Sequence, residues 1–267
     1  MPELAEVEFF RKRWNPGAGQ AVVRALLHPH AGVFKESATP ALIRERLAGA
    51  VLLSSEAAAK QMIFRFSGDG WLGIHLGMTG ELSVQPPNHA PGKHDHLVLA
   101  QRDRCLVFTD PRMFGRVQFS TGASAPAWWT GIAPAILSPA FTAESVAAFL
   151  KRRARAPVKA VLLMQERFPG IGNWMADEIL WRAAIHPRRA AGSLDAAEIR
   201  ALHRECRHVC RRALATIGET FADPPRSWLF PHRWEDGGRC PKTGVPLVRE
   251  EIGGRTTCWS PGRQREP

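Results

Sequence analysis

The apolar pattern of this chain changes once, near residue 141, from the pattern of short strands to the pattern of helices. Before that point, "KQMIFRFSGDGWLGIHLG" predicts two strands joined by a Gly-Asp-Gly turn, and "HLVLAQRDRCLVFTD" predicts another hairpin, followed by "GRVQFS". Short strands at regular spacing between residues 50 and 120 are typical of a β-sandwich or barrel. A helix is expected ahead of them over residues 3–14, where Leu4, Val7 and Phe10 recur at helical spacing.

The second half of the chain has helical periodicity from Thr142 onward. "TAESVAAFLKRR" begins with a Thr-x-x-Ser cap region, and "PVKAVLLMQE" begins with proline, which suits a first helical turn. The long stretch "SLDAAEIRALHRECRHVCRRALATIG" predicts a helix that ends at Gly218. Its apolar face consists of Ile199, Leu202, Cys206, Val209, Ala213 and Ile217, and its basic face of His203, Arg204, Arg207, His208, Arg211 and Arg212.

These patterns predict an α+β fold. The boundary between the two halves is placed in residues 122–141, "GASAPAWWTGIAPAILSPAF", which are rich in Ala, Pro and Gly. We expect an N-terminal β-sandwich domain with a leading helix, a linker, a helical domain and a C-terminal β-hairpin. Their expected ranges are 1–132, 133–141, 142–230 and 231–267.

The positive charge of the chain is concentrated in its second half. Residues 1–141 carry 14 Lys and Arg against 11 Asp and Glu, and residues 142–267 carry 22 against 14, so +8 of the net +11 falls on the second half. Such an excess favours a polyanion partner, most often nucleic acid, although a basic, arginine-rich proteome is the alternative. No apolar stretch is long enough to cross a membrane, and no signal-peptide pattern is present, so we expect an intracellular protein.

The five cysteines do not suggest a disulfide framework, because their number is odd and no signal peptide precedes them. Cys206 and Cys210 lie four residues apart on one face of the long predicted helix. We expect both of them in the core rather than in a metal site.

The C-terminal stretch "RCPKTGVPLVREEIGGRTTCWSPGRQ" resembles a zinc ribbon that has lost ligands. A structural zinc needs four thiolate or imidazole ligands, and Thr243, Ser260 and Arg263 stand where cysteines would have to accompany Cys240 and Cys258. No metal is therefore expected, and a two-cysteine site completed by His232 is the alternative. The residues expected to hold this hairpin by packing are Val245, Leu247, Ile252 and Trp259.

Residues 168–180, "FPGIGNWMADEIL", predict a tight glycine turn between two helices, the second beginning near Asn173. The unpaired backbone N–H groups at such a helix start attract an anion such as a phosphate. An ordinary helix–turn–helix corner without a ligand is the alternative. The neighbouring basic helix favours DNA.

Two loops of the β-rich half expose unusual side chains. "HLGMTG" (75–80) and "DPRMFG" (110–115) place Met78, Arg112 and Phe114 on turns at strand ends. An exposed Met and Phe suit a wedge that enters a base stack and replaces an extruded nucleotide. The alternative is that these side chains tuck into the sandwich.

Together with the opening "MPELAEVEFF", these stretches resemble the formamidopyrimidine-DNA glycosylase/endonuclease VIII family over nearly the whole chain. "HLGMTG" and "DPRMFG" are similar to its intercalation loops, and "GIGNWMADEILWRAAIHP" is similar to its helix–two-turn–helix element. The start and "HLGMTG" are closer to the formamidopyrimidine branch. The chain departs from the family at Ala5, where proline is usual, and in the hairpin, which the resemblance implies to be a zincless finger.

The resemblance implies that Met1 is removed and that the amine of Pro2 is the nucleophile. Its attack on the sugar C1′ expels the base and forms an iminium, an electron sink that permits strand cleavage by elimination. Glu3 is then the general acid, and Lys60 resembles the lysine that contacts a phosphate and assists catalysis. From the opening residues alone, Pro2 and Glu3 simply begin a helix.

The DNA contacts that the resemblance implies fall into two classes. The side chains that fill the gap and face the orphaned base are Met78, Arg112 and Phe114. The phosphate contacts are His75, Asn173 and, in "GGRTT", Arg255.

The implied activity is that of a monomeric, bifunctional DNA glycosylase/AP lyase of base excision repair. Its expected partner is damaged double-stranded DNA, its expected lesions are oxidised purines, and no cofactor is expected. A lesion range shifted to oxidised pyrimidines, abasic sites or bulky lesions is an alternative, because residues 218–231 depart from the formamidopyrimidine-branch pattern. Two further alternatives are a catalytically silent damage-binding protein and a helix–hairpin–helix glycosylase. The second is an all-helical class, so it does not account for the β-rich half of this chain.

Overall fold

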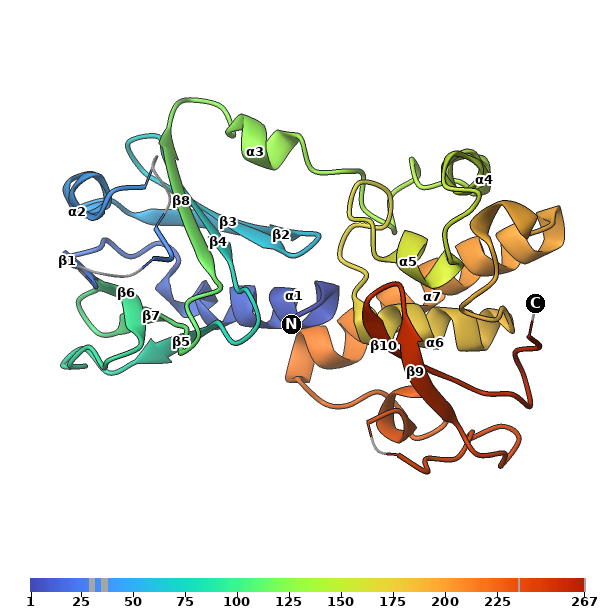
Figure 1. The fold of residues 1–267 in the computed structure, drawn as a ribbon. Coiled ribbons are helices and arrows are strands. Elements are labelled where there is room, and N and C mark those ends of the chain that lie inside the picture. The colour runs from blue at the N-terminus through green and yellow to red at the C-terminus, as the bar shows by residue number, and fades with distance from the viewer. Residues whose placement is uncertain (29–31, 35–37, 235, 267) are drawn as a thin grey trace. The chain divides into compact units, whose positions relative to one another are not determined.

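The computed structural model describes residues 1–28, 32–34, 38–234 and 236–266 (Figure 1). The chain divides into two compact units, Met1–Pro2 with Glu6–Ile132 and Glu3–Ala5 with Ala133–Pro267. Strands dominate the first unit and helices the second, so the predicted α+β class is confirmed. Among the described residues, no helix is both long and apolar enough to span a membrane.

Two antiparallel four-stranded sheets form the β-sandwich of the first unit, drawn in blue to green in Figure 1. Their strand orders are β1-β6-β7-β5 and β2-β3-β4-β8. The strands are β1 (Arg24–Leu27), β2 (Leu52–Ala58), β3 (Gln61–Phe66), β4 (Gly70–His75), β5 (Glu81–Gln85), β6 (Asp95–Ala100), β7 (Cys105–Thr109) and β8 (Arg116–Thr121). The helices before, between and after them are α1 (Leu4–Arg13), α2 (Pro40–Leu47) and α3 (Ala127–Thr130).

The core of the first unit lies between the two sheets, because apolar side chains on alternate strand positions face inward. Phe64 and Phe66 from β3 and Phe108 from β7 are almost fully buried in one cluster with Trp14. Trp14 follows α1 directly, and its indole N–H donates to the carbonyl of Val107 at 3.3 Å. This contact ties the end of the leading helix to the sandwich.

The second unit consists of packed helices and a C-terminal hairpin. Its elements are α4 (Ala143–Arg152), α5 (Val158–Leu162), α6 (Asn173–Ala183), α7 (Ala196–Thr220), β9 (Val248–Ile252) and β10 (Arg255–Trp259). The predicted Thr-x-x-Ser start is confirmed, because the side chains of Thr142 and Ser145 cap the first turn of α4. Cys206 and Cys210 are buried in the helical core, as predicted.

The long helix α7 differs from the prediction in two ways. It passes Gly218 and ends at Thr220, because Gly218 is buried and packing overrides its weak helix propensity. Its basic face is also partly used within the unit. Arg207 donates to the carbonyls of residues 136–138 at 2.9 to 3.1 Å, and His203 Nε2 bonds to the carbonyl of Phe141.

The hairpin packs through three of the four predicted residues. Leu247, Ile252 and Trp259 are buried, but Val245 is 37% exposed, so the prediction is wrong there. Val245 precedes β9 and is held by its backbone instead, since its carbonyl accepts the Cys240 N–H at 2.9 Å.

Candidate functional site

The carboxylate of Glu3 occupies the N-terminus of helix α6. Its Oε2 accepts the N–H groups of Gly172 and Met175 at 2.8 and 3.2 Å, and its Oε1 accepts the Trp174 N–H at 2.9 Å. The Glu3 side chain is almost fully buried. The sequence predicted that the N–H donors at this turn attract a phosphate. In the structure they hold a carboxylate of the chain itself, at a helix start where the dipole also favours negative charge.

Gly172 leaves the space that the Glu3 carboxylate fills. A Cβ at this position would lie 2.2 Å from Glu3 Cδ and 2.4 Å from Oε1. The backbone of Gly172 has a φ of −122°, which any residue adopts. The glycine is thus required by close approach, whereas Gly170, with a φ of +87°, is required by the turn itself. Sequence reasoning treated both glycines as turn formers and missed this difference.

Asn173 and Arg255 come together through the backbone of the hairpin. The Asn173 side chain donates through Nδ2 to the carbonyl of Thr256 at 2.8 Å, and Arg255 is the exposed first residue of β10. The hairpin turn contains Gly253, with a φ of +61°, and a Cβ there would lie 2.8 Å from Cβ of Ala160. The two predicted phosphate contacts of this unit are therefore neighbours.

In the first unit, Lys60 and His75 are also neighbours. Lys60 lies in the turn between β2 and β3, and the next residue, Gln61, pairs with His75 at the end of β4. Burial, followed by the charges of Arg116 and Lys60, lowers the pKa of His75. Its Nδ1 accepts the Gly77 N–H at 3.0 Å, so the neutral ring carries its proton on Nε2, a suitable donor to a phosphate oxygen.

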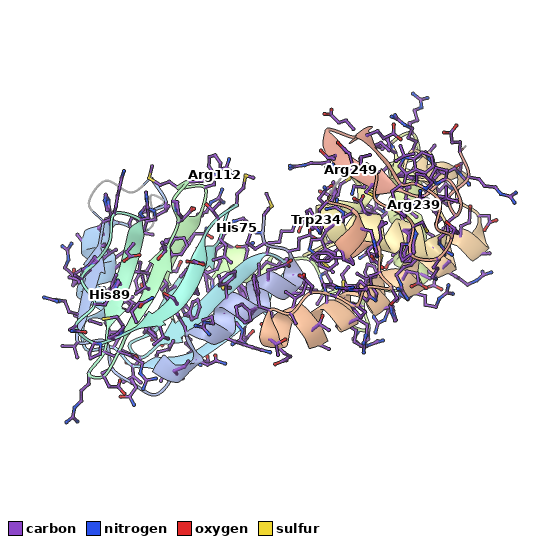
Figure 2. The ribbon with its side chains drawn as sticks, turned by 90° about the horizontal axis from the view of Figure 1, so that it is seen from below. His75, His89, Arg112, Trp234, Arg239 and Arg249 are labelled. Carbon is purple, nitrogen blue, oxygen red and sulfur yellow. The ribbon has the colours of Figure 1, made fainter. Side chains whose placement is uncertain are left out.

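The two predicted wedge loops present their side chains to solvent rather than to the sandwich core. Met78 is 39% exposed and Phe114 is 56% exposed. The guanidinium of Arg112 lies over the Phe114 ring, with its central carbon 4.8 Å from the ring centroid. Figure 2 shows Arg112 and His75 on the same side of this unit, away from His89.

Asp110 joins these two loops into one assembly, a role that sequence reasoning missed. Its buried carboxylate accepts the Thr79 hydroxyl at 2.7 Å, the Gly115 N–H at 2.7 Å and the Arg112 N–H at 3.2 Å. The loop backbones also touch, because a Cβ on Gly77 would lie 2.4 Å from the carbonyl carbon of Phe114. Both residues of this link stand in the two loop motifs, Asp110 as the first residue of "DPRMFG" and Thr79 as the threonine of "HLGMTG".

For the base-excision activity that the resemblance implies, replacing Thr79 by Val should slow excision from duplex DNA about tenfold, since a hydrogen bond to a charged group contributes roughly 1.5–3 kcal/mol. Single-turnover excision from duplex and single-stranded substrates measures the effect, which should be smaller on single strands. Thr109→Val is the matched control, because its hydroxyl donates to Asp95 at 2.6 Å rather than to Asp110. Equal losses for both variants would contradict the coupling of the loops.

Glu178 anchors the end of the segment that follows α7. It is buried in α6 and accepts backbone N–H groups of Leu229 and Phe230, the latter at 3.1 Å. The neighbouring Trp228 ring lies under the guanidinium of Arg182, which also pairs with Glu205. Burial raises the pKa of Glu178 to about 7, although Arg182 and the two N–H donors act in the opposite direction.

This raised pKa predicts a pH dependence of stability. A carboxyl group with a pKa of about 7 in the folded state and 4.5 otherwise binds more protons when folded, so stability falls as the pH rises from 4.5 through 7. Relative to Glu178→Gln, the wild type should lose on the order of 3 kcal/mol over this window. Denaturant titrations of both proteins at pH 5 and pH 8 measure the difference. Parallel pH dependences would contradict the assignment.

The side chain of Cys240 is engaged in hydrogen bonds within the protein. Among the described residues, no group of three or more His, Cys, Asp or Glu could hold a metal ion. The Trp181 indole N–H donates to Cys240 Sγ at 3.4 Å, and Arg263 donates to the Trp181 carbonyl at 3.1 Å. Burial alone would raise the pKa of the Cys240 thiol, but hydrogen bonding, including the bond from Trp181, lowers it to about 7. These positions therefore do not fit a structural zinc.

Metal analysis of the purified protein should find well under one zinc per chain, and a strong chelator should leave the midpoint of thermal unfolding unchanged. The reason is that four ligands are needed, and His232 Nε2, the alternative ligand, bonds to the carbonyl of Arg226 at 2.8 Å. Zinc near one equivalent, or a chelator-dependent midpoint, would show that the two cysteines do hold a metal.

Comparison with known proteins gives consistent matches. The family model for the formamidopyrimidine-DNA glycosylase N-terminal domain matches residues 1–117, and the model for the H2TH domain of the same enzyme matches residues 132–223. The chain is 37% identical over 277 residues to formamidopyrimidine-DNA glycosylase of Geobacter sulfurreducens, covering 99% of this chain and 100% of that protein. It is 40% identical over 213 residues to that of a Roseiflexus species, covering 76% of this chain and 78% of that protein.

Solved structures support the fold. The structure of Lactococcus lactis formamidopyrimidine-DNA glycosylase bound non-covalently to DNA with an AP site matches with a TM-score of 0.86, covering 99% of this chain and 100% of that one. A complex of the wild-type Lactococcus lactis protein with DNA containing an oxidised pyrimidine matches over the same shares with a TM-score of 0.88. Both are 24% identical in sequence, so this likeness concerns the fold.

Proposed function

This chain belongs to the formamidopyrimidine-DNA glycosylase family, and on that premise we propose that the amine of Pro2, freed by removal of Met1, is its nucleophile. The protein is a DNA glycosylase of base excision repair, and AP lyase activity is typical of its family. The observation that carries the proposal is the position of Glu3. Three backbone donors at the start of α6 hold its carboxylate and so restrain the residue to which Pro2 is bonded.

The reaction that this assignment implies begins with a bond between the Pro2 nitrogen and the sugar C1′. The glycosidic bond breaks and the base leaves with a proton. The Pro2 nitrogen then loses its own proton, and its lone pair forms an iminium with C1′ as the C1′–O4′ bond of the sugar ring breaks and O4′ takes up a proton. Loss of a C2′ proton to a base then expels the 3′ phosphate by elimination, and water finally releases the amine. Borohydride reduces the iminium to a stable adduct, so trapping on abasic DNA tests the proposal.

We assign Glu3 as the general acid that protonates the sugar or the leaving base. The three N–H donors and the start of α6 stabilise the carboxylate that remains after the proton has been transferred. The same donors fix the direction of the side chain, which a general acid needs in order to reach one reacting atom.

We assign the remaining contacts to DNA by their chemistry. In the first unit, Lys60 supplies a cation and His75 a neutral N–H donor to phosphate. In the second unit, Arg255 supplies the cation and Asn173 the neutral donor. Met78, Arg112 and Phe114 are exposed on coupled loops and suit insertion into a base stack. Solved complexes of the Lactococcus lactis protein contain AP-site DNA, oxidised-pyrimidine DNA and, for a mutant form, Fapy-dG DNA.

We propose oxidised purines as the main lesions, with the loop held by Glu178 and Trp228 setting the preference. Excision rates on duplexes that carry an oxidised purine, an oxidised pyrimidine or an abasic site test this ranking. Faster excision of the oxidised pyrimidine than of the oxidised purine would show that the lesion range is shifted to pyrimidines. We also propose that the protein acts as a monomer inside the cell, in the cytoplasm or at the nucleoid.

A further inference from the structure

A buried cluster of charges lies between the helices and the hairpin of the second unit. Lys159 on α5, Asp177 on α6 and Arg233 after α7 are at most 5% exposed. The Lys159 ammonium contacts Oδ1 of Asp177, and the Arg233 guanidinium contacts Oδ2, its Nε at 3.2 Å. Buried charges are costly unless they are paired and hydrogen-bonded. The reaction described above assigns no step to these three side chains.

The cluster also binds the backbone of the segments that carry the predicted phosphate contacts. Lys159 Nζ donates to the carbonyl of Asn173 at 2.8 Å, and Asp177 Oδ2 accepts the Cys258 N–H at 3.1 Å. Asn173 in turn donates to the Thr256 carbonyl at 2.8 Å. Helix α6 and strand β10, side by side in Figure 1, are thus joined at both Thr256 and Cys258. Strand β10 begins with Arg255.

The hairpin needs such a support. A two-stranded hairpin is only marginally stable in water by itself, and the positions that would hold a zinc carry Thr243, Ser260 and Arg263 beside Cys240. Besides the bond from Trp181 to Cys240, Arg263 and Gln264 bond to the backbone carbonyls of residues 181, 182 and 185 at the other end of the hairpin. They lie beyond Trp259, at the end of β10 away from Arg255.

We propose that Asp177 is a positioning residue that holds the Arg255 end of the hairpin against α6, the task that a metal would otherwise share. Asp177 balances the positive charges of Lys159 and Arg233, and it accepts a hydrogen bond from the backbone of β10. Through Lys159 it also fixes the start of α6 at Asn173. This inference rests on the proposed phosphate contact of Arg255.

A double-mutant cycle tests the inference. Binding to a duplex with an uncleavable abasic-site analogue is measured over a range of salt for wild type, Arg255→Ala, Asp177→Asn and the double variant. In the wild type, Arg255→Ala should weaken binding about tenfold and reduce the salt slope by about one. In the Asp177→Asn background, the same change should have less than about a twofold effect, because Arg255 is no longer held in place.

Two further variants keep the test decisive. If Asp177→Asn fails to fold, Lys159→Met/Asp177→Leu/Arg233→Met removes all three charges together, and buried ion clusters tolerate such apolar replacement. Asp236→Asn is the control, because Asp236 is 90% exposed in its pair with Arg249 at the same hairpin. It should leave the full effect of Arg255→Ala intact.

The outcomes separate the two proposals. A full tenfold effect of Arg255→Ala in the Asp177 or triple-variant background would overturn the positioning role and leave the Arg255 contact standing. No effect of Arg255→Ala in the wild type would overturn the contact itself, and with it the inference. A tenfold effect of Arg255→Ala in the wild type and in Asp236→Asn, with less than a twofold effect in the cluster variants, would support the inference.

Discussion

Protein that retains one extra residue ahead of Pro2 is expected to form no borohydride-trapped adduct with abasic DNA. Acylation converts the Pro2 amine into an amide, whose nitrogen lone pair is delocalised and no longer attacks C1′. We expect a loss of about a thousandfold or more, since the nucleophile is removed and not merely weakened. Denaturing electrophoresis after reduction measures the fraction of DNA that is covalently bound.

A cleavable extension provides the matched control. When a protease removes the extra residue and exposes Pro2, the adduct should return to the level of the native protein. Pro2→Gly, which keeps a terminal amine, should still form an adduct at a reduced rate. An undiminished adduct from the blocked protein would move the nucleophile to another amine, with Lys60 as the first candidate, and would leave the family assignment untouched.

Fold class and exposed loops could be predicted because they depend on local pattern. Alternating strands before residue 121 and helical periods after Thr142 determine which elements form, and glycine-flanked turns predict where Met78 and Phe114 lie. The end of α7 could not be predicted from Gly218, because a glycine often follows the last turn of a helix, whereas this one is buried inside it. The pattern likewise placed Arg207 on the basic face of this helix but did not reveal its three backbone acceptors in residues 136–138.

The contacts that organise the candidate site were invisible in the sequence for the same reason. Glu3 and Gly172 are 169 residues apart, and Thr79 and Asp110 are 31 apart. Each residue taken alone has an ordinary explanation as a helix acid, a turn glycine or a loop polar group. Their roles arise only from pairing, so one sequence without a fold does not reveal them.

Replacing Gly172 by Ala is expected to slow base excision about a hundredfold while leaving the fold and DNA binding in place. The new Cβ would overlap Glu3 Cδ, so the carboxylate must leave the start of α6, and removal of a general acid costs typically a hundredfold or more. The backbone itself accepts alanine at a φ of −122°. Single-turnover excision from a damaged duplex measures the loss, with thermal unfolding as a check on folding.

The substrate decides whether this loss reflects Glu3. On DNA that already carries an abasic site there is no base to expel, so adduct formation by Gly172→Ala should fall far less than base excision. Glu3→Gln should show the same split, and the double variant should be no slower than Glu3→Gln alone, because both changes remove one acid. Gly32→Ala is the control, since its Cβ would meet nothing within 4 Å. Equal losses on damaged and abasic DNA would place the effect of Gly172 outside proton transfer and return Glu3 to a purely structural role as the anion at the start of α6.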